Sequence, residues 1–521
     1  MPDTNMLQIL KTIPDLDVES YVVTTGSKEI VKQFDIKSVK KILFIIPPTF
    51  DFGDFVASSP TNVATIAAFL KQQGYELKVI DAGVHKIKFE DIIEITKDYG
   101  PDLVAIGCNF STLHNPSRLI AEMIKKGYKN VPILVGGNHA TAVPEMILKD
   151  SSIDFVVIGE AEVVLPDLLT AIENKTDLRK VNGLCISDGN SQVRTHPADF
   201  FKNLEELPFP DYSLFDINRY PIYNINSSRG CIFRCTYCAS GVIYKRKYRP
   251  RSAKSIIAEI DYLVNNFGKK TVWFSDDLFG QDHKFVEELC NTLIDKKTNV
   301  QWSVVTRATT VPLDQLKLMK KAGCTGISVG IESGDDEMLK VMKKDTNADA
   351  YRMSVPKVKK VLRTRGFFLI GNIGETKESV WNTFKLIKEI KPDYGTFCPV
   401  VPLPGTEIYS QLINMGILKP EDLNWDKFYG IDHEGNYDDE SLKTTASWCN
   451  LSAEQIREYC NYGNMLSLLV ALTPGEIVKR MRRDGLSQQL RDDKDKVRRL
   501  FKYAARNPKT FLSTVKIWIT A

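Results

Sequence analysis

Two blocks of alternating strand and helix patterns, separated by a proline-rich joint, constrain the fold of this chain more than any other feature. The first block starts with the apolar run KKILFII (40–46), which is typical of a strand buried in a parallel sheet. The block ends near DFVVIG (154–159) and contains five such runs with helix-period segments between them. This order predicts a doubly wound, Rossmann- or flavodoxin-like α/β sheet.

The second block follows the joint NLEELPFPDYSLFDINRYP (203–221), whose prolines disfavour regular structure. Six strand patterns run from YNINSS (223–228) to YGTFCPVV (394–401), again separated by helix-period segments. Six repeats are too few to close an eight-stranded barrel, so we expect an open, partial (β/α)6 barrel. Functional groups are then expected at the C-terminal ends of its strands.

These patterns divide the chain into five expected segments. They are an N-terminal extension (1–35), a doubly wound domain (36–185), a proline-rich linker (186–222), a partial barrel (223–425) and a mainly helical, basic extension (426–521). A net charge of +4 over 521 residues gives no reason to expect a nucleic-acid partner. The first residues lack the pattern of a secretory signal, so a reducing cytoplasm is the expected location.

Three cysteines lie within eight residues, in the stretch CIFRCTYC (231–238). Cys231, Cys235 and Cys238 have C-x3-C-x2-C spacing and follow the first expected strand of the barrel. A structural zinc ion needs four ligands, and the nearest histidines, His196 and His283, are distant in sequence. Three thiolates on one loop suit a four-iron, four-sulfur cluster that keeps one iron open. Zinc or buried free thiols are the alternatives.

The stretch CIFRCTYC resembles the signature of the radical S-adenosylmethionine (SAM) superfamily, including the aromatic Tyr237 before the last cysteine. The resemblance implies that the open iron binds the amino and carboxylate groups of SAM. Reduction then yields methionine and a 5′-deoxyadenosyl radical. The turns GNIGET (371–376) and VPLPGTE (401–407) also resemble late barrel turns of the family.

Other strand ends resemble the SAM-binding positions of that family. WFSDDLFG (273–280) makes Ser275, Asp276 and Asp277 candidates for the methionine amino group, although Asp277 would also suit a helix N-cap. Arg307 is a candidate clamp for the SAM carboxylate, with a surface ion pair as the alternative. Glu332 takes the place of the family's acidic partner for the ribose hydroxyls.

A doubly wound domain before such a barrel resembles the cobalamin-binding subgroup of the superfamily. The resemblance places cobalamin against loops that follow strands, with the contacts Pro48, Thr49, Gly137, His139, Ala140, Glu160 and Ala161. The stretch DAGVHK (81–86) departs from the D-x-H-x-x-G motif of many cobalamin proteins, so no cobalt ligand is named. The alternative is a domain that has lost its ligand and persists as a lid.

These features are similar to a class B radical SAM methyltransferase. The resemblance implies a 4Fe–4S cluster, SAM and cobalamin, and methylation of an unactivated carbon of a small-molecule or lipid-like substrate. Electrons would come from an external reductant such as flavodoxin or ferredoxin. The alternatives are a non-methylating cyclase, rearrangement enzyme or oxidase of the same architecture, and a cofactor-carrying scaffold or electron-transfer partner. The substrate itself is not indicated by the sequence.

The C-terminal end is basic and amphipathic. Residues 479–521 hold 13 Lys and Arg against four Asp, and KVRRLFKYAARNPKTFLSTVKIWITA (496–521) mixes these cations with aromatic and aliphatic residues. Such an end would suit peripheral contact with an anionic membrane. The favoured alternative is a helical cap whose apolar face packs on the barrel.

Overall fold

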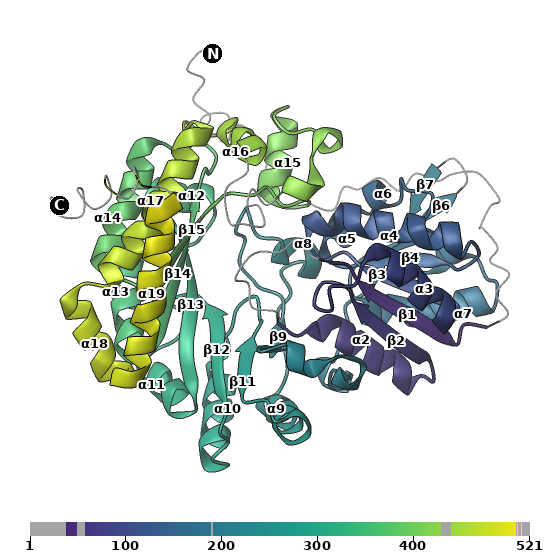
Figure 1. Ribbon diagram of the computed structural model, residues 1–521, viewed down its shortest axis with the longest axis horizontal. Helices are drawn as coiled ribbons and strands as arrows, with labels where there is room; N and C mark the ends of the chain where they lie inside the picture. Colours follow the sequence, from purple (N-terminus) through teal and green to yellow (C-terminus); the bar gives the residue numbers. More distant parts are fainter. Residues whose placement is uncertain are drawn as a thin grey trace.

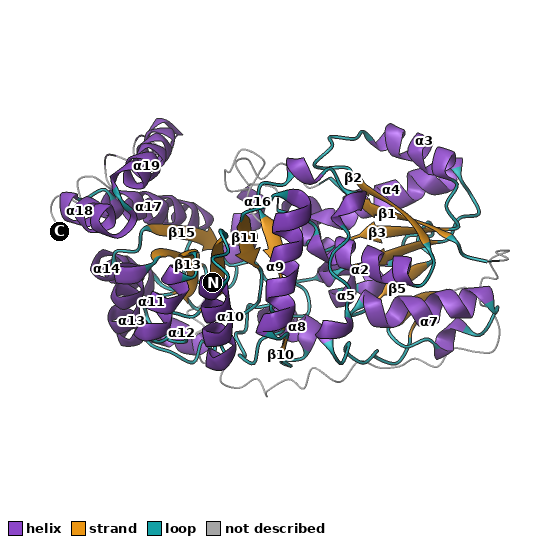
Figure 2. Cartoon of the chain, turned by 90° about the horizontal axis from the view of Figure 1, so that it is seen from below, coloured by secondary structure: helices purple, strands orange, loops and turns teal. Residues whose placement is uncertain are grey.

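The computed structural model describes residues 38–48, 58–188, 191–428 and 439–506, together with residues 508 and 512. Two α/β units lie side by side along the long axis (Figure 1). Seen from below, the two sheets lie on either side of the centre of the molecule, with helices α8 and α9 between them (Figure 2). The α/β fold class predicted from the sequence is confirmed, with a mainly parallel sheet in the first unit and a fully parallel one in the second.

The N-terminal unit contains a seven-stranded sheet in the order β2-β1-β3-β4-β5-β6-β7. The first five strands are mutually parallel, as predicted, whereas β6 and β7 add an antiparallel hairpin that extends the sheet beyond residue 185. The strands are β1 (Lys41–Ile46), β2 (Glu76–Asp81), β3 (Leu103–Gly107), β4 (Ile133–Gly136), β5 (Phe155–Val157), β6 (Leu184–Asp188) and β7 (Ser191–Arg194).

Helices cover both faces of this sheet, each face with its own apolar core. The chain leaves β1 for β2 on one side and returns to β3 on the other, so the loops after β1 and β3 diverge. Such a switch point is where open α/β sheets bind ligands. The helices are α2 (Thr61–Gln72), α3 (Phe89–Tyr99), α4 (His114–Gly127), α5 (Asn138–Ala142), α6 (Pro144–Ile147) and α7 (Ala161–Glu173).

The second unit is the predicted partial barrel. Its six strands are all parallel and lie in the order β15-β14-β13-β12-β11-β8, with consecutive β-strands of the barrel adjacent and no closing pair. The strands are β8 (Tyr223–Ile225), β11 (Thr271–Phe274), β12 (Gln301–Thr306), β13 (Cys324–Glu332), β14 (Arg363–Ile370) and β15 (Tyr394–Pro399). The helices are α8 (Ser240–Tyr244), α9 (Ala253–Phe267), α10 (His283–Asp295), α11 (Leu313–Lys321), α12 (Asp336–Val341), α13 (Ala348–Val361) and α14 (Lys377–Ile390).

Helix α17 covers the open edge of the barrel at β15. Asn464 accepts a hydrogen bond from Phe397 N (2.8 Å) and donates one to Phe397 O (3.1 Å), and Ser467 Oγ accepts from Gly395 N. These side chains satisfy edge groups that would otherwise be free to pair with another strand. The C-terminal helices are α15 (Glu407–Asn414), α16 (Asp439–Ala446), α17 (Ala453–Ala471), α18 (Pro474–Asp484) and α19 (Leu486–Arg506).

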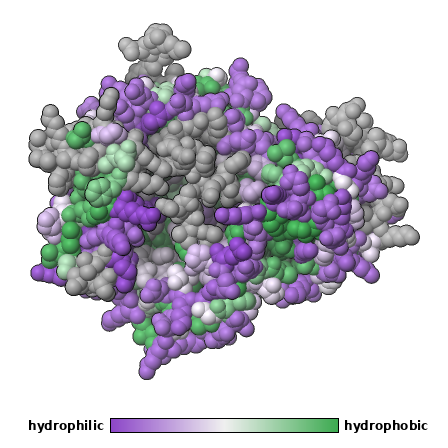
Figure 3. All heavy atoms as spheres, in the orientation of Figure 1, coloured by the Kyte–Doolittle hydropathy of each residue, from purple (hydrophilic) through white to green (hydrophobic). Residues whose placement is uncertain are grey.

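The described part of the basic extension packs on the barrel, as expected from the favoured prediction of a helical cap. Arg483 Nη1 on α18 donates to Asp393 Oδ2 (2.8 Å), and Lys496 Nζ on α19 lies 4.5 Å from the centre of the Tyr394 ring. Residues 513–521, with Trp518, lie outside the described residues, so membrane contact stays a prediction. No helix within the described residues is both long and apolar enough to cross a lipid bilayer. On the face drawn in Figure 3, hydrophobic side chains form separate patches.

Side chains of the joint and of the two units interlock. Thr61 Oγ1 at the start of α2 lies 2.9 Å from the Tyr212 hydroxyl and donates to Asn224 O of β8 (3.0 Å). The Tyr220 hydroxyl donates to Asp81 Oδ2 at the end of β2 (2.7 Å). These buried bonds hold the C-terminal edge of the N-terminal sheet against β8 and the joint that precedes it.

Candidate functional site

The three predicted cluster cysteines lie on one loop at the mouth of the barrel. The loop follows β8 and runs between two short strands, β9 (Ser228–Arg229) and β10 (Arg249–Pro250), which pair antiparallel. Thr236 in the middle of the loop donates from N to Met342 O (3.0 Å) and accepts from Ile408 N (3.0 Å). The loop is therefore bound to the segments after α12 and at the start of α15.

The cysteines have the exposure that an iron–sulfur cluster needs. All ten cysteines of the chain are free thiols; Cys231 and Cys235 are half-buried and Cys238 is exposed. Within the described residues, no three His, Cys, Asp or Glu side chains converge to hold a single metal ion. Thiolates of an iron–sulfur cluster bind separate iron atoms, so this donor set fits a cluster held by three cysteines better than a zinc ion.

Tyr237, Glu332 and Lys344 form a buried triangle beside the cysteine loop. The Tyr237 hydroxyl and Lys344 Nζ both donate to Glu332 Oε1 (3.0 Å each), and Lys344 Nζ also donates to the Tyr237 oxygen (2.9 Å). Burial disfavours the ammonium, but the charge of Glu332 outweighs it and raises the pKa of Lys344 above its usual value. A side chain at Gly330 would collide with Glu332 Oε1 and would lie 3.0 Å from Lys344 Nζ.

Arg307 lies next to this triangle and is only 8% exposed. Its Nη2 donates to the main-chain oxygens of Lys344 and Asp345, and its guanidinium carbon lies 3.8 Å from the centre of the Phe233 ring, within the cysteine loop. Arg307 is thus not the surface ion pair of the alternative interpretation. Its buried Nη1 has no hydrogen-bond partner among the described residues, so it has a donor available for an anionic ligand such as a carboxylate.

The acidic side chains that follow β11 accept hydrogen bonds from other residues of the protein. Asp276 accepts from Ser227 Oγ (2.5 Å) and Ser228 N (2.7 Å), and its burial raises the pKa of this carboxyl to about 7. Asp277 accepts from Gly230 N (3.1 Å), directly before Cys231. Asp277 is not a helix N-cap, because α10 begins at His283 and Asp282 caps it.

Ser275 is exposed at the end of β11, and its hydroxyl donates to Asn226 Oδ1. The amino-group site predicted for Ser275, Asp276 and Asp277 therefore lies beside the cysteine loop, with both carboxylates already hydrogen-bonded to that loop or its base.

The described cobalamin residues predicted from the sequence follow β1, β4 and β5 at the C-terminal edge of the N-terminal sheet. Gly137 has φ 125° and lies so close to the loop after β3 that a Cβ atom would meet Cys108 O at 2.7 Å. Only glycine fits there. Ala140 is fully buried behind it, and Pro48 and Ala161 are half-buried at the C-terminal edge. Thr49 lies outside the described residues.

His139 is buried in a polar cluster rather than exposed toward the edge. Its Nδ1 lies 3.0 Å from Ser111 Oγ and its Nε2 lies 3.0 Å from His114 Nδ1. Trp425, in the short helix η7 (Trp425–Lys427), stacks on His114 with ring centres 5.2 Å apart. Burial lowers the pKa of His139 to about 3 and that of His114 to about 4, with Arg118 adding to the shift of His114 against Asp426 and Asp150.

These two histidines predict an acid-sensitive fold. Below pH 6.5 the two histidines bind protons in the unfolded chain but stay neutral in the folded protein. The free energy of unfolding is therefore highest above that pH and falls as the pH drops toward 4. At pH 5 the expected loss is about 2 kcal/mol per histidine. Urea unfolding of wild type and His139→Gln from pH 7.5 to 5 checks this. The slope of the free energy of unfolding against pH should be smaller in the variant, by the equivalent of about one bound proton. Identical slopes in the two proteins would contradict the interpretation.

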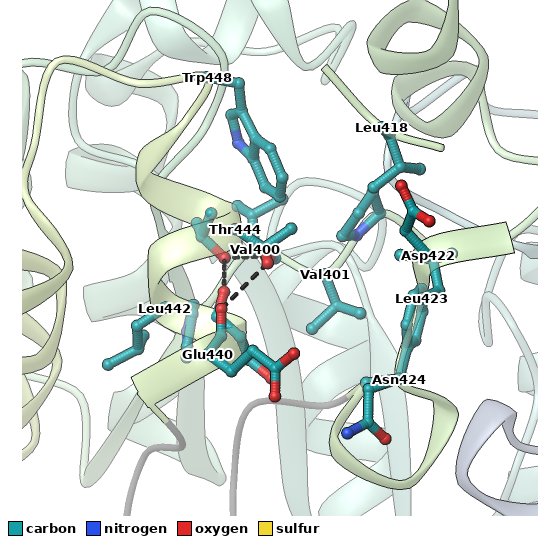
Figure 4. A pocket seen from close by; sticks show the side chains of 15 residues that line it. Val400, Val401, Leu418, Asp422, Leu423, Asn424, Glu440, Leu442, Thr444 and Trp448 are labelled. Atoms are coloured by element: carbon teal, nitrogen blue, oxygen red, sulfur yellow. Dashed lines mark hydrogen bonds between the residues drawn. The ribbon is translucent and has the colours of Figure 1, made fainter. Parts of the chain in front are cut away.

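A pocket opens at the C-terminal end of β15, between the segment 418–428 and α16 (Figure 4). It has an empty volume of about 570 Å³, part of which is open to solvent. Val400, Leu418 and Trp448 form an apolar wall that is continuous with the cluster on which Tyr237 packs. Asp422, Asn424 and Thr444 add polar groups around it. The segment that forms one wall also carries Trp425, which contacts the N-terminal unit.

Fold and site together define a class of enzyme. A partial (β/α)6 barrel carries three cysteines and buried cations at its mouth, and a flavodoxin-like sheet presents its ligand-binding edge beside them. This is the arrangement of an enzyme with two cofactor sites, an iron–sulfur site beside the unpartnered guanidinium donor of Arg307 and a second site at the C-terminal edge of an open sheet.

Comparison with known proteins identifies the family. Residues 225–387 match the radical SAM superfamily, and residues 57–169 match the B12 binding domain. An uncharacterized methyltransferase of Pyrococcus horikoshii is 30% identical over 405 residues, which are 76% of this chain and 87% of the relative. The chain therefore belongs to the radical SAM superfamily, in the group that also carries a B12 binding domain. The predicted cofactors, a 4Fe–4S cluster, SAM and cobalamin, are confirmed by these two family models.

Two further similarities are informative. The anaerobic magnesium-protoporphyrin IX monomethyl ester cyclase of Cereibacter sphaeroides is 30% identical over 396 residues, 71% of this chain, and the match spans 63% of that protein. The solved structure of the radical SAM methyltransferase TsrM from Kitasatospora setae, with cobalamin and a [4Fe-4S] cluster bound, aligns with a TM-score of 0.65. It is 17% identical and covers 84% of this chain and 90% of TsrM, which confirms the fold.

Proposed function

We propose that this enzyme transfers a methyl group from SAM, by way of cobalamin, to an unactivated carbon of its substrate. The observation that carries the proposal is the contact between the two cofactor-binding regions. Helix α8, which starts two residues after Cys238, packs against α5 at the switch-point edge. Two cofactors that act on one substrate must lie close together, and the contact between α8 and α5 supports the proposal because it would bring the two sites near each other.

The residues of the barrel mouth have defined tasks in this proposal. Cys231, Cys235 and Cys238 would hold the cluster, and Arg307 and Lys344 would bind the SAM carboxylate. When bound, the reduced cluster supplies the electron that cleaves SAM, and cobalamin carries the methyl group. Gly137 lets the loop after β4 pack directly against the loop after β3, and these two loops would hold the corrin or its nucleotide tail. The chain's further task is to exclude water from the substrate.

The pocket in Figure 4 is the proposed place for the substrate. Its apolar wall suits a hydrophobic body, and Asp422, Asn424 and Thr444 suit a hydroxyl or amino group at its edge. We therefore expect a mainly apolar small molecule with few polar groups, which keeps lipid-like substrates among the candidates.

Filling this pocket should weaken ligand binding. Val401 lines it and is half-buried, so Val401→Trp is expected to lower the affinity for benzyl alcohol by about tenfold, because a bulky ring occupies the apolar space. Ligand-observed NMR checks the affinity. Met353→Trp is the matched control, since Met353 is 63% exposed on α13, outside the pocket lining. Equal weakening in both variants, or in neither, would contradict the assignment.

The test of the function starts with anaerobic purification, cluster reconstitution and addition of hydroxocobalamin. After desalting, about four irons and one corrin per chain are expected. Reduction with deuterated-methyl SAM, in the presence of candidate substrates, should then give deoxyadenosine and a deuterated-methyl product. A full cluster without retained corrin would indicate that the N-terminal unit acts only as a lid.

A non-methylating radical reaction is the second candidate, because the cyclase of Cereibacter sphaeroides is as similar in identity as the methyltransferase of Pyrococcus horikoshii. Deoxyadenosine together with a substrate-derived product that lacks the SAM methyl group would favour it. A cofactor-carrying scaffold would give no deoxyadenosine at all. In each enzymatic case we propose a flavodoxin- or ferredoxin-type reductant and a reducing, cytoplasmic setting, which the ten free thiols support.

A further inference from the structure

Two arginines hold the base of the cysteine loop. Arg229 and Arg249 are paired residues of the antiparallel strands β9 and β10, and all three cluster cysteines lie in the segment between them. Their guanidinium groups both bind Glu160 of the N-terminal unit. Arg229 Nη1 and Arg249 Nη2 donate to Glu160 Oε1 at 2.9 and 2.7 Å, and Arg249 Nη1 donates to Oε2 at 2.9 Å.

The carboxylate of Glu160 is fully engaged by the protein. Phe201 N of the linker adds a fourth hydrogen bond, to Oε2 at 2.7 Å. Four hydrogen bonds occupy the acceptor positions of a carboxylate, so Glu160 has none left for an amide of the corrin ring. Glu162 Oε1 accepts from Arg229 Nη2 at 2.7 Å, so two carboxylates balance two guanidinium groups.

This quartet is buried. The side chains of Glu160 and Glu162 are each 4% exposed, and those of Arg229 and Arg249 are 11% and 14% exposed. Burial opposes ionisation of Glu160, but its bond to Arg249 and the charge of Arg229 outweigh burial and hold the pKa of its carboxyl below the usual value. A buried ionic cluster in which two carboxylates balance two guanidinium groups is a rigid connection, and removal of one member leaves an uncompensated charge.

The main chain of Glu160 belongs to the cobalamin edge. Glu160 follows β5 and is the N-cap residue of α7, and the next residue, Ala161, is one of the cobalamin contacts predicted from the sequence. The preceding Gly159 donates from N to Thr141 Oγ1 of α5 at 3.0 Å. The backbone of Glu160 thus belongs to the loops of the expected cobalamin site. Its carboxylate binds the base of the loop that carries the cluster cysteines.

We propose that Glu160 is a positioning residue that couples occupation of the cobalamin site to the order of the cluster loop. Its role is to fix Arg229 and Arg249, and through them residues 231–248, against the N-terminal unit when cobalamin orders the loop between β5 and α7. The inference rests on the proposed function, because it requires that cobalamin binds at this edge.

Hydrogen–deuterium exchange of the reconstituted, cluster-containing enzyme tests the coupling. In wild type, hydroxocobalamin should slow exchange in peptides covering residues 231–248 by about tenfold. In Glu160→Gln protein that retains the cluster and the corrin, as counted by iron and corrin analysis, this cobalamin-dependent slowing should be lost. Glu162→Gln weakens a single bond, the one to Arg229, and should lose part of the slowing. This variant provides the test if Glu160→Gln does not fold.

Glu145→Gln is the control, because Glu145, whose side chain is 43% exposed, forms a bidentate pair with Arg194 of β7 within the N-terminal unit. It should leave the slowing unchanged. Bound corrin without slowing in wild type, or equal slowing in wild type and both quartet variants, would overturn the inference while leaving the proposed function intact. Wild-type enzyme that retains no corrin would overturn the cobalamin-dependent function, and the coupling with it.

Discussion

Replacement of Cys231, Cys235 or Cys238 with alanine, one at a time, is expected to remove most of the iron from anaerobically reconstituted protein and to abolish deoxyadenosine formation. Each thiolate is expected to bind a different iron, and no other cysteine lies in this loop to substitute for a lost one. Iron analysis, the absorbance of the cluster near 400 nm and quantified deoxyadenosine give the readouts.

Cys290→Ala is the control for this series. Cys290 is a free thiol buried in the apolar core of the barrel on α10, so its loss should leave iron content and deoxyadenosine formation unchanged. If an alanine variant of the loop kept a full cluster, or if Cys290→Ala lost it as well, the assignment of the cluster to the loop would be wrong.

The fold could be predicted because its buried parallel strands appear in the sequence as continuous apolar runs. The run at 40–46 became β1, and all six expected barrel strands formed one parallel sheet. The hairpin of β6 and β7 was not singled out, because its two short strands carry little apolar alternation. The cover of β15 by Asn464 and Ser467 is also invisible in sequence, since single polar residues in a helix do not indicate what they will contact.

The site was predictable where its residues are close in sequence or end a strand. The three cysteines are local, Arg307 follows β12 and Glu332 is the last residue of β13, so pattern reasoning singled them out as candidates. Residues that act through distant partners gave no signal. Arg249 meets Glu160 from 89 positions away, and Lys344 is one of several lysines in a short stretch, distinguished only by its burial.

Lys344→Met is expected to be the most damaging single substitution of a residue outside the cysteines. Lys344 is 5% exposed and neutralises Glu332, so its removal leaves a buried carboxylate whose remaining partner is the Tyr237 hydroxyl. Breaking a buried ion pair in this way costs about 3–5 kcal/mol of the free energy of unfolding. The loss of a charge-assisted bond to the SAM carboxylate should also weaken SAM binding by about tenfold or more.

The double variant Glu332→Gln/Lys344→Met separates these two effects. Removing both charges takes away the uncompensated carboxylate, so urea unfolding should show most of the lost stability restored. Affinity for SAM, measured by equilibrium dialysis on reconstituted enzyme, should stay low relative to Glu332→Gln alone, because the cation that binds the carboxylate is still absent. If the double variant instead bound SAM as tightly as Glu332→Gln, the role of Lys344 would be limited to neutralising Glu332. Arg307 would then be the group that binds the SAM carboxylate, because its buried Nη1 has no partner among the described residues.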